Sequence, residues 1–444
     1  MGRDAQPGFD NQPPEYLSAR AASELLGVKR DTLYAYVSRG LVRAVPDPTS
    51  RGGRARRYHR DDLLRLRARH DARAGHGPVA AGALRWGEAV LESAVTSISP
   101  AGPSYRGHTA TTLAARGVTF ERVAELLWTA SLPATAPWWP PPPSPPLPHG
   151  LAALVPPGVH PLRAMTLVPV ALAALGPAGP MPPDEDLPRA RSLLRSLAAS
   201  LGLASSRVQL AASQPTLAEA ALAALGAARS PAAVAAVNRA LVLCADHELN
   251  VSTFASRIAA SAGADVYACV SAALATASGH LHAGVCDVVE AMAAQAVDSA
   301  GAAALIAARV AAGGPVPGFG HPLYPGGDPR GRALVDEARA LDPEGTRTAV
   351  VLALATVMQA AGREPPTVDL GLVALAAALD LPPGSATALF VLGRSAGWIA
   401  HALEQRAQGV LLRPRARYIG RESVSTEPSS APIKPSAAIP RKNP

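Results

Sequence analysis

The sequence predicts a mainly α-helical protein of more than one domain. Its 444 residues exceed the usual length of a single domain. Apolar residues make up 48% of the chain and aromatic residues only 4%. A core of Ala, Leu and Val favours packed helices over aromatic-rich β-sandwiches. From residue 150 to residue 420 the pattern is that of Ala- and Leu-rich helices without alternating strands, so this stretch is expected to be all α.

The N-terminal part has the pattern of two short helices joined by a tight turn. Residues 1–14 are polar and proline-bearing and are expected to be disordered. Ser18 is expected to cap a first helix that ends at Gly27, and a second helix ends at Gly40. Because only about three residues separate the two, their spacing is that of a helix-turn-helix. An Arg-rich segment follows, and then a charged helix that starts near Asp61.

The stretch AASELLGVKRDTLYAYVSRGLVRAVPDPTSRGGRARRYHRDDLLRL resembles the winged helix-turn-helix of MerR-type and excisionase-type DNA binders, which predicts such a module over residues 15–70. In these modules the second helix enters the major groove and a basic hairpin reaches the phosphates. The candidate DNA contacts are Lys29, Arg30, Thr32, Arg51, Arg54, Arg56 and Arg57. The alternatives are a small helical module with solvated arginines, or one that contacts protein.

The rest of the chain divides into a linker, a body and a tail. Residues 71–84 are a polar linker before the body at residues 85–420. Within the body the stretch 86–127 is expected to be helical, with Tyr105-Arg106-Gly107 between two helices. Residues 133–148, PATAPWWPPPPSPPLP, are expected to form an exposed polyproline-like loop, solvated or docked to a partner, because each proline fixes φ and removes a donor. Residues 421–444 are rich in Pro and Ser and are expected to be a disordered tail.

The positive charge lies at the two ends of the chain. The net charge is +8, yet residues 76–420 hold 23 Lys and Arg and 23 Asp and Glu, whereas residues 1–75 hold 15 against 9. A nucleic-acid partner is therefore expected at the N-terminal part. The sequence has three cysteines and no C-x-x-C pair, which predicts reduced thiols and no structural zinc. It has no apolar leader segment, and prolines interrupt its longest uncharged stretches, so we expect a cytoplasmic protein without a membrane span.

Four short polar islands interrupt the apolar helices of the body. Three carry histidine: ADHELN with His247, GHLHAG with His282, and GFGHPLY with His321, which is followed by Arg330 in DPR. The fourth is TVD, which ends at Asp369. Glycines beside two of these histidines allow a ligand to approach the backbone closely. A carboxylate and two histidines that converge in a helical body form a general acid–base constellation.

Arginines near the end of the body add positive charge. Arg394 lies on a helix that is apolar on more than one side, and a buried guanidinium requires an anion. Arg413 follows just beyond this helix. Because arginine binds carboxylates through two parallel hydrogen bonds, these arginines and the histidines indicate a small polycarboxylate substrate.

These islands, in this order, resemble the citrate synthase family. The match runs through GEAVLESAVTSIS, SYRG, FERVAELLW, CADHELNVSTFASRIAASAGADVY, SGHLHAG, GFGHPLY, DPR, VD, GRSAGWIAHALEQ and RPR, and covers nearly all of residues 85–420. The resemblance implies a mainly α-helical fold with a large domain, a small closing domain and an obligate dimer. It implies an acyltransferase of the tricarboxylic acid cycle that condenses acetyl-CoA with oxaloacetate and water to citrate and CoA, with no cofactor or metal.

The resemblance also implies a role for each matched residue. Asp369 would abstract a methyl proton from acetyl-CoA, while His282 would hydrogen-bond the thioester oxygen. His321 would polarise the oxaloacetate carbonyl and protonate it. The oxaloacetate carboxylates would be held by His247, Arg330, Arg394 and, from the neighbouring subunit, Arg413. The sequence departs from the family pattern nearby: Cys286 and Thr367 stand where asparagine is usual, Ala283 replaces a glycine and Cys244 replaces a common histidine.

Other readings of the same residues stay open. A 2-methylcitrate synthase would use propionyl-CoA, since one methylene gives only about 1–3 kcal/mol of discrimination. A DNA-binding regulator would use the synthase-like body to sense citrate or CoA metabolites. Alternatives also remain for individual residues. His280 and His282 could form a metal site with His247, and Asp369 could be a helix N-cap. His401 is expected to be a packing group.

Overall fold

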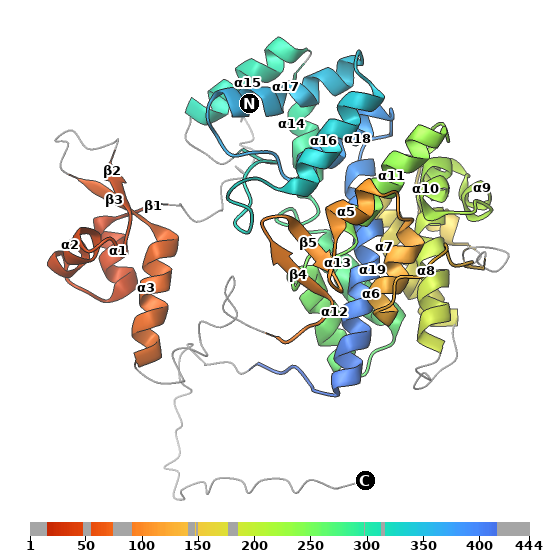
Figure 1. Ribbon diagram of the computed structural model, residues 1–444, viewed down its shortest axis with the longest axis horizontal. Helices are drawn as coiled ribbons and strands as arrows, with labels where there is room; N and C mark the ends of the chain where they lie inside the picture. Colours follow the sequence, from red (N-terminus) through yellow and green to blue (C-terminus); the bar gives the residue numbers. More distant parts are fainter. Residues whose placement is uncertain are drawn as a thin grey trace, which may run out of the picture. The chain divides into compact units, whose positions relative to one another are not determined.

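The chain forms two compact units in a computed structural model (Figure 1). Among the residues that the structure describes, those up to Glu92 form the N-terminal unit, and those from Ser93 to Arg413 form the second unit. The structure describes residues 16–47, 55–73, 91–140, 147, 150–175, 185–296, 298–311 and 316–414.

The N-terminal unit is a small helical module with a three-stranded antiparallel sheet of order β1-β3-β2. Its elements are β1 (Tyr16–Ser18), α1 (Ala19–Leu26), α2 (Arg30–Ser38), β2 (Ala44–Pro46), β3 (Arg56–His59) and α3 (Arg60–Arg73). The predicted limits of α1 are confirmed, because the Ser18 side chain accepts a hydrogen bond from the Ala21 amide and Gly27 ends the helix at φ 65°. Leu33 and Tyr58 are fully buried in the core of this unit.

The second unit is built almost entirely from packed helices, as the sequence predicted. They are α5 (Ala110–Ala115), α6 (Phe120–Thr129), α7 (Pro161–Leu175), α8 (Asp186–Ser200), α9 (Val208–Ala212), α10 (Leu217–Leu225), α11 (Pro231–Cys244), α12 (Val251–Ser261), α13 (Val266–Ala277), α14 (Val285–Ala293), α15 (Ser299–Ala311), α16 (Pro329–Leu341), α17 (Thr346–Ala360), α18 (Val368–Ala378) and α19 (Ser385–Gln408), with short 3₁₀ turns at Leu151–Leu154 and Leu203–Ser205.

Helix α19 forms the centre of this unit. It packs against α6, α11, α12, α13 and α18, and Figure 1 shows it crossing the body. Most of its side chains are buried, which explains why apolar residues occupy more than one of its faces. Helices α14 to α18 lie together at one side of the body, where α16 packs on α18 and α15 on α17.

The predicted break at Tyr105–Gly107 is present, but the prediction that helices flank it was wrong over the stretch 96–109. Strands β4 (Thr96–Ser99), β5 (Gly102–Tyr105) and β6 (His108–Thr109) form a three-stranded antiparallel sheet there. Arg106 and Gly107 turn between β5 and β6 with φ of 47° and 87°, the left-handed backbone of a tight hairpin turn. The Tyr105 hydroxyl donates to the carbonyl of Val242 at 3.0 Å and so joins this sheet to α11.

The proline-rich loop is anchored rather than fully exposed, which corrects the expectation for residues 133–148. Trp139 is only 4% exposed, stacks on Trp128 with ring centroids 5.5 Å apart, and donates from Nε1 to Glu125 at 2.9 Å. Trp138 is 80% exposed. Residues 141–146 and 148 of this loop lie outside the described ranges.

Two further features of the structure concern the cysteines and the lengths of the helices. Cys244, Cys269 and Cys286 are all buried free thiols. Over the ranges that the structure describes, no helix combines the length and the apolar composition needed to cross a membrane.

Candidate active site

The polar islands of the sequence come together where α11, α12, α16, α18 and α19 meet. His247 lies in the α11–α12 loop, His282 in the α13–α14 loop and His321 in the segment before α16. Arg330 and Asp369 lie in the first turns of α16 and α18, and Arg394 lies in the middle of α19. The ring of His282 packs against that of Phe390, over which the Arg394 guanidinium lies. Asp328 pairs with Arg330 and also accepts a hydrogen bond from the Val368 amide, next to Asp369. One connected site therefore contains these six residues.

His247, His321 and Tyr324 form a cluster of rings at one side of the site. The His247 and His321 ring centroids are 5.4 Å apart, and His247 Nε2 lies 2.8 Å from the Tyr324 hydroxyl. The guanidinium of Arg330 lies over the Tyr324 ring at 5.5 Å from its centroid. Burial, and then Arg330, lowers the pKa of His321 to about 4 and holds the pKa of His247 well below its ordinary value. Both imidazoles are therefore neutral near pH 7.

Asp328 holds Arg330 in place, a contact that sequence reasoning missed. Arg330 donates from Nε and Nη2 to the two Asp328 oxygens at 3.0 and 2.9 Å, and the Val368 amide donates to the same carboxylate at 3.1 Å. Burial acts to raise the pKa of Asp328, but Arg330 outweighs it and holds this pKa below its ordinary value. The sequence signal was present, since an Asp before Pro is a common start of a helix, and Asp328 caps α16.

Arg394 is the buried cation of α19. It is 2% exposed, donates from Nε to the Cys244 carbonyl at 2.9 Å, and lies over the Phe390 ring at 4.8 Å from the centroid. Burial lowers the pKa of Arg394, while the buried carboxylate of Asp246 acts in the opposite direction. Asp246 thus supplies part of the negative charge that the sequence required near this guanidinium.

Ser252, which sequence reasoning also missed, fixes the orientation of His282. Its hydroxyl lies 2.7 Å from His282 Nε2 and accepts a hydrogen bond from Trp398 Nε1 at 3.0 Å. Asn250 caps α12 and contacts the same hydroxyl at 2.7 Å. Burial, and then Arg394, lowers the pKa of His282 to about 4. The motif HELNVSTF gave a signal, because an N-cap Asn two residues before Ser252 places that serine in the first turn.

Two side chains contact the carboxylate of Asp369. The Thr367 hydroxyl donates to Oδ2 at 2.9 Å, and the Cys286 thiol donates to Oδ1 at 3.4 Å. At both of these positions the family that the sequence resembles usually has asparagine. Burial raises the pKa of Asp369, and both hydrogen bonds oppose part of that shift. The N-cap of α18 is Thr367, so the alternative reading of Asp369 as the N-cap was wrong.

The remaining candidates fall outside this cluster. Arg413 is exposed and lies just beyond the end of α19. His280 is exposed, and among the described residues no group of three or more His, Cys, Asp and Glu side chains is arranged to hold a metal ion.

The candidate DNA contacts belong to the N-terminal unit. Lys29, Arg30 and Thr32 are exposed at the start of α2. On β3, Arg56 is exposed and Arg57 pairs with Asp47 at 3.2 Å. Arg51 and Arg54 lie outside the described residues.

The depressed histidine pKa values predict a loss of stability on acidification. His282 and His321 have pKa values of about 4, whereas an unfolded histidine titrates near 6.5. Between about pH 6.5 and 4 the unfolded chain binds protons that the folded chain does not, so stability should fall as pH falls through this window. We expect the melting temperature of the wild type to drop more between about pH 7 and 5 than that of a His282→Gln, His321→Gln double variant. Identical pH dependence of the two proteins would contradict the assignment.

Comparisons with known proteins cover both units. The family model "Citrate synthase, C-terminal domain" matches residues 83–415, and the family model "Helix-turn-helix domain" matches residues 16–71. Citrate synthase 2 of Bacillus subtilis is 34% identical over 194 residues, 43% of this chain and 52% of that protein, so the match spans about half of its length. The 2-methylcitrate synthase of Mycobacterium tuberculosis is 29% identical over 371 residues, 76% of this chain and 90% of that protein.

Solved structures share the fold of the body. Citrate synthase of Thermoplasma acidophilum, in a ternary complex with carboxymethyl coenzyme A and oxaloacetate, superposes with a TM-score of 0.68 at 24% identity, covering 76% of this chain and 96% of that chain. Citrate synthase of Thermotoga maritima superposes with a TM-score of 0.63 at 22% identity, covering 77% of this chain and 96% of that chain.

Proposed function

Because this chain belongs to the citrate synthase family, we propose that its body condenses acetyl-CoA with oxaloacetate and water to give citrate and CoA. The observation that carries the proposal is the joint presence, in one site, of the carboxylate of Asp369, the neutral imidazoles of His282 and His321, and the buried guanidiniums of Arg330 and Arg394. This set fits a reaction that needs a base, two hydrogen-bond donors and binding of a dicarboxylate.

Asp369 and His282 act on the acyl-CoA. Asp369 removes a proton from the carbon next to the thioester, and its raised pKa makes it a stronger base than an ordinary carboxylate. His282 is neutral near pH 7. In the tautomer with its proton on Nδ1, for which the Ser252 hydroxyl donates to Nε2 in place of Asn250, it donates a hydrogen bond to the thioester oxygen and stabilises the enol or enolate. Ser252 and Trp398 keep the imidazole in place for this step.

The histidines and arginines act on oxaloacetate. His321 polarises the ketone and protonates it as the carbon–carbon bond forms. Arg330 uses Nε and Nη2 on Asp328, so Nη1 is its donor for a substrate carboxylate. Arg394 and His247 bind the carboxylates from α19 and from the α11–α12 loop. In a homodimer, the exposed Arg413 of a second copy completes this set.

A cavity beside His321 offers space for the rest of the acyl-CoA. Its volume is about 460 Å³, and it is lined by Gly320, His321, Tyr324, Pro325 and the segment 362–365. Arg363 and Glu364 are part of that lining and pair with each other at 3.6 Å, so the wall of the cavity carries one charge of each sign.

The comparison of two acyl-CoAs tests the choice of substrate. Relatives of both kinds match this chain, and one methylene changes transition-state binding by only about 1–3 kcal/mol. We expect kcat/KM to be higher for acetyl-CoA than for propionyl-CoA, with oxaloacetate as the common partner. A higher value for propionyl-CoA would make the protein a 2-methylcitrate synthase.

Cys286 is expected to tune the proposed base. Its thiol stabilises the charged form of Asp369, so Cys286→Ala should raise the pKa of this carboxylate. The acidic limb of the kcat/KM profile should then move to higher pH by about one pH unit or less. Cys286→Ser keeps a donor and should stay closer to the wild type. The matched control is Cys269→Ala, which removes a buried thiol that instead donates to the Ala264 carbonyl at 3.6 Å. A Cys286→Ala profile that coincides with this control would rule out the tuning role.

A second activity, DNA binding, is favoured by the basic start of α2. Phosphate contacts by Lys29 and Arg30 should make binding of a short fluorescein-labelled duplex weaken with added salt, and Arg30→Ala should reduce the slope of log K against log salt by about one. Arg20→Ala is the control, because it removes an exposed arginine of α1 that pairs with Glu24. Equal slopes for the two variants would exclude α2 as the contact. Salt-sensitive DNA binding without oxaloacetate-dependent CoA release would favour the metabolite-sensing regulator.

A further inference from the structure

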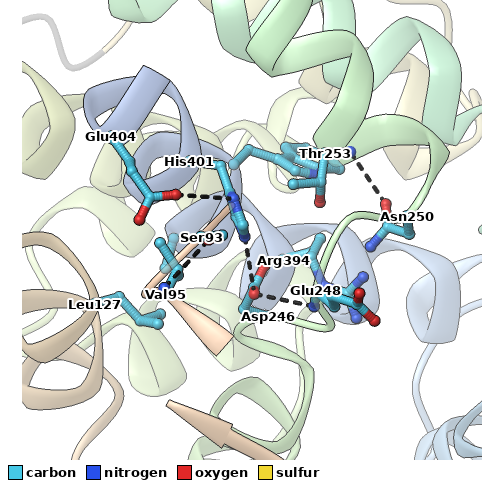
Figure 2. A network of polar contacts seen from close by, with 12 residues as sticks. Ser93, Val95, Leu127, Asp246, Glu248, Asn250, Thr253, Arg394, His401 and Glu404 are labelled. Carbon is cyan, nitrogen blue, oxygen red and sulfur yellow. Dashed lines mark hydrogen bonds and ion pairs between the residues drawn. The ribbon is translucent and has the colours of Figure 1, made fainter. Parts of the chain in front are cut away.

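We propose that Asp246 and His401 are positioning residues for oxaloacetate, because a buried relay from Arg257 through His401 to Asp246 fixes the loop that carries His247. The inference rests on the proposed function and deepens it. Figure 2 shows the His401–Asp246 part of this relay, with His401 between Glu404 and Asp246 and with Arg394 close by.

The Asp246 carboxylate fixes the backbone on both sides of His247. Asp246 directly precedes His247 and is 0% exposed. Its Oδ2 accepts a hydrogen bond from the amide of Glu248 at 3.2 Å (Figure 2). Glu248 has a φ of 55°, a left-handed conformation that is unfavourable for a residue other than glycine. The Asp246 carboxylate therefore holds a strained turn whose central residue is His247.

His401 sets the orientation of the Asp246 carboxylate. It comes from α19, is 0% exposed, and has Nε2 at 3.2 Å from Asp246 Oδ2 and Nδ1 at 3.1 Å from Arg257 Nη1. The Glu404 carboxylate lies 4.0 Å from Nδ1, beyond hydrogen-bond distance, whereas the Arg257 guanidinium lies within it and can only donate. Nδ1 therefore accepts, and the ring proton lies on Nε2, where it is donated to Asp246. The expected packing role of His401 is thus accompanied by a specific hydrogen-bonding role.

Arg257, at the other end of the relay, is fixed between α12 and α19. Arg257 has a fully buried side chain that donates from Nε to Gln405 at 2.9 Å, from Nη1 to Glu404 at 2.7 Å and from Nη2 to Gln408 at 2.9 Å. All of these acceptors belong to α19. Arg257 therefore has little freedom, and it imposes the tautomer of His401 that Asp246 needs.

Asp246 also connects the relay to Arg394. The amide of Gly397, three residues beyond Arg394 on α19, donates to the Ala245 carbonyl at 2.9 Å. A Cβ at Gly397 would overlap the Asp246 carboxylate, so the loop lies directly against the helix. The same carboxylate acts electrostatically on the Arg394 guanidinium. Two of the proposed oxaloacetate ligands, His247 and Arg394, thus depend on the position of Asp246.

Two substitutions at His401 separate the hydrogen bond to Asp246 from the packing of the ring. His401→Gln places an amide donor near the position of Nε2, whereas His401→Asn reaches only the position of Nδ1, toward Arg257. We expect His401→Asn to weaken oxaloacetate binding about tenfold, measured by calorimetry and as KM, since a hydrogen bond to a buried charge is lost. His401→Gln should bind oxaloacetate nearly as the wild type does, and KM for acetyl-CoA should be unchanged in both.

Matched measurements distinguish positioning from a loss of stability. Ser256→Ala is the control, because it removes another buried hydrogen bond between α12 and α19, from the Ser256 hydroxyl to the Trp398 carbonyl, and should leave oxaloacetate binding unchanged. If His401→Asn and His401→Gln weaken binding equally, or not at all, the positioning role is overturned. A wild-type protein that binds no oxaloacetate would instead contradict the proposed function.

The far end of the relay gives a second test if a His401 variant fails to fold. Arg257→Lys keeps the positive charge but loses the fixed set of donors that holds Nδ1 of His401. We expect weaker oxaloacetate binding with an unchanged KM for acetyl-CoA. Wild-type oxaloacetate binding by a folded Arg257→Lys protein would overturn the relay.

Discussion

Asp369→Asn is expected to lower the kcat of condensation by about a thousandfold or more, because the substituted amide cannot accept the proton that the acyl-CoA must lose. The geometry should survive, since the amide is nearly the same shape and the Thr367 hydroxyl still has an oxygen to contact. Oxaloacetate binds through other residues, so its dissociation constant should change little. The measurement is CoA release at saturating substrates, together with calorimetry of oxaloacetate.

The control for this variant is an exposed acidic residue of the same unit that is not part of the proposed site. Asp336→Asn on α16 removes a charge from an exposed pair with Arg339 and should leave kcat unchanged. A kcat of Asp369→Asn equal to that of this control would remove Asp369 from the mechanism. Loss of both kcat and oxaloacetate binding would instead indicate collapse of the whole site.

Asp328→Ala is expected to destabilise the body by about 3–5 kcal/mol, because it leaves the Arg330 guanidinium buried without its counter-charge. Asp328 and Arg330 are 3% and 2% exposed. The substitution also removes the acceptor of the Val368 amide at the start of α18. The shift of the urea unfolding midpoint of the body, at constant slope, measures the effect.

An exposed pair on the same helix provides the matched control. The side chains of Asp336 and Arg339 are 62% and 56% exposed, so Asp336→Ala should cost no more than about 1 kcal/mol. If the two alanine variants unfold at the same urea concentration, the buried pair has no special stabilising role. A destabilised Asp328→Ala protein should also lose affinity for oxaloacetate, since Arg330 is one of its proposed ligands.

Local signals in the sequence were sufficient for the helices and for the order of the site residues. The limits of α1 depend on Ser18 and Gly27, whose effects act within a few residues. The sheet at residues 96–109 was missed because its turn uses Arg106 and Gly107 instead of the Asn-Gly or Asp-Gly pair that signals a hairpin. Trp139 was expected to be exposed because its partners, Trp128 and Glu125, belong to a preceding helix.

The contacts that tune the site were beyond what the sequence could predict. The departures at Cys286 and Thr367 were visible in the sequence, but only the fold brings both side chains to the carboxylate of Asp369. His401 was recognised as buried, while its place between Arg257 and Asp246 depends on the packing of α19 on α12. Sequence pattern thus located the chemical groups, and long-range packing determines their hydrogen-bond partners.

The most direct test of the central claim is oxaloacetate-dependent release of free CoA thiol from acetyl-CoA by the full-length protein. We predict rapid release when both substrates are present, none above background when either is omitted, and loss of the reaction in Asp369→Asn. A folded protein that binds oxaloacetate yet releases no CoA in its presence would contradict the proposal that this site is a synthase.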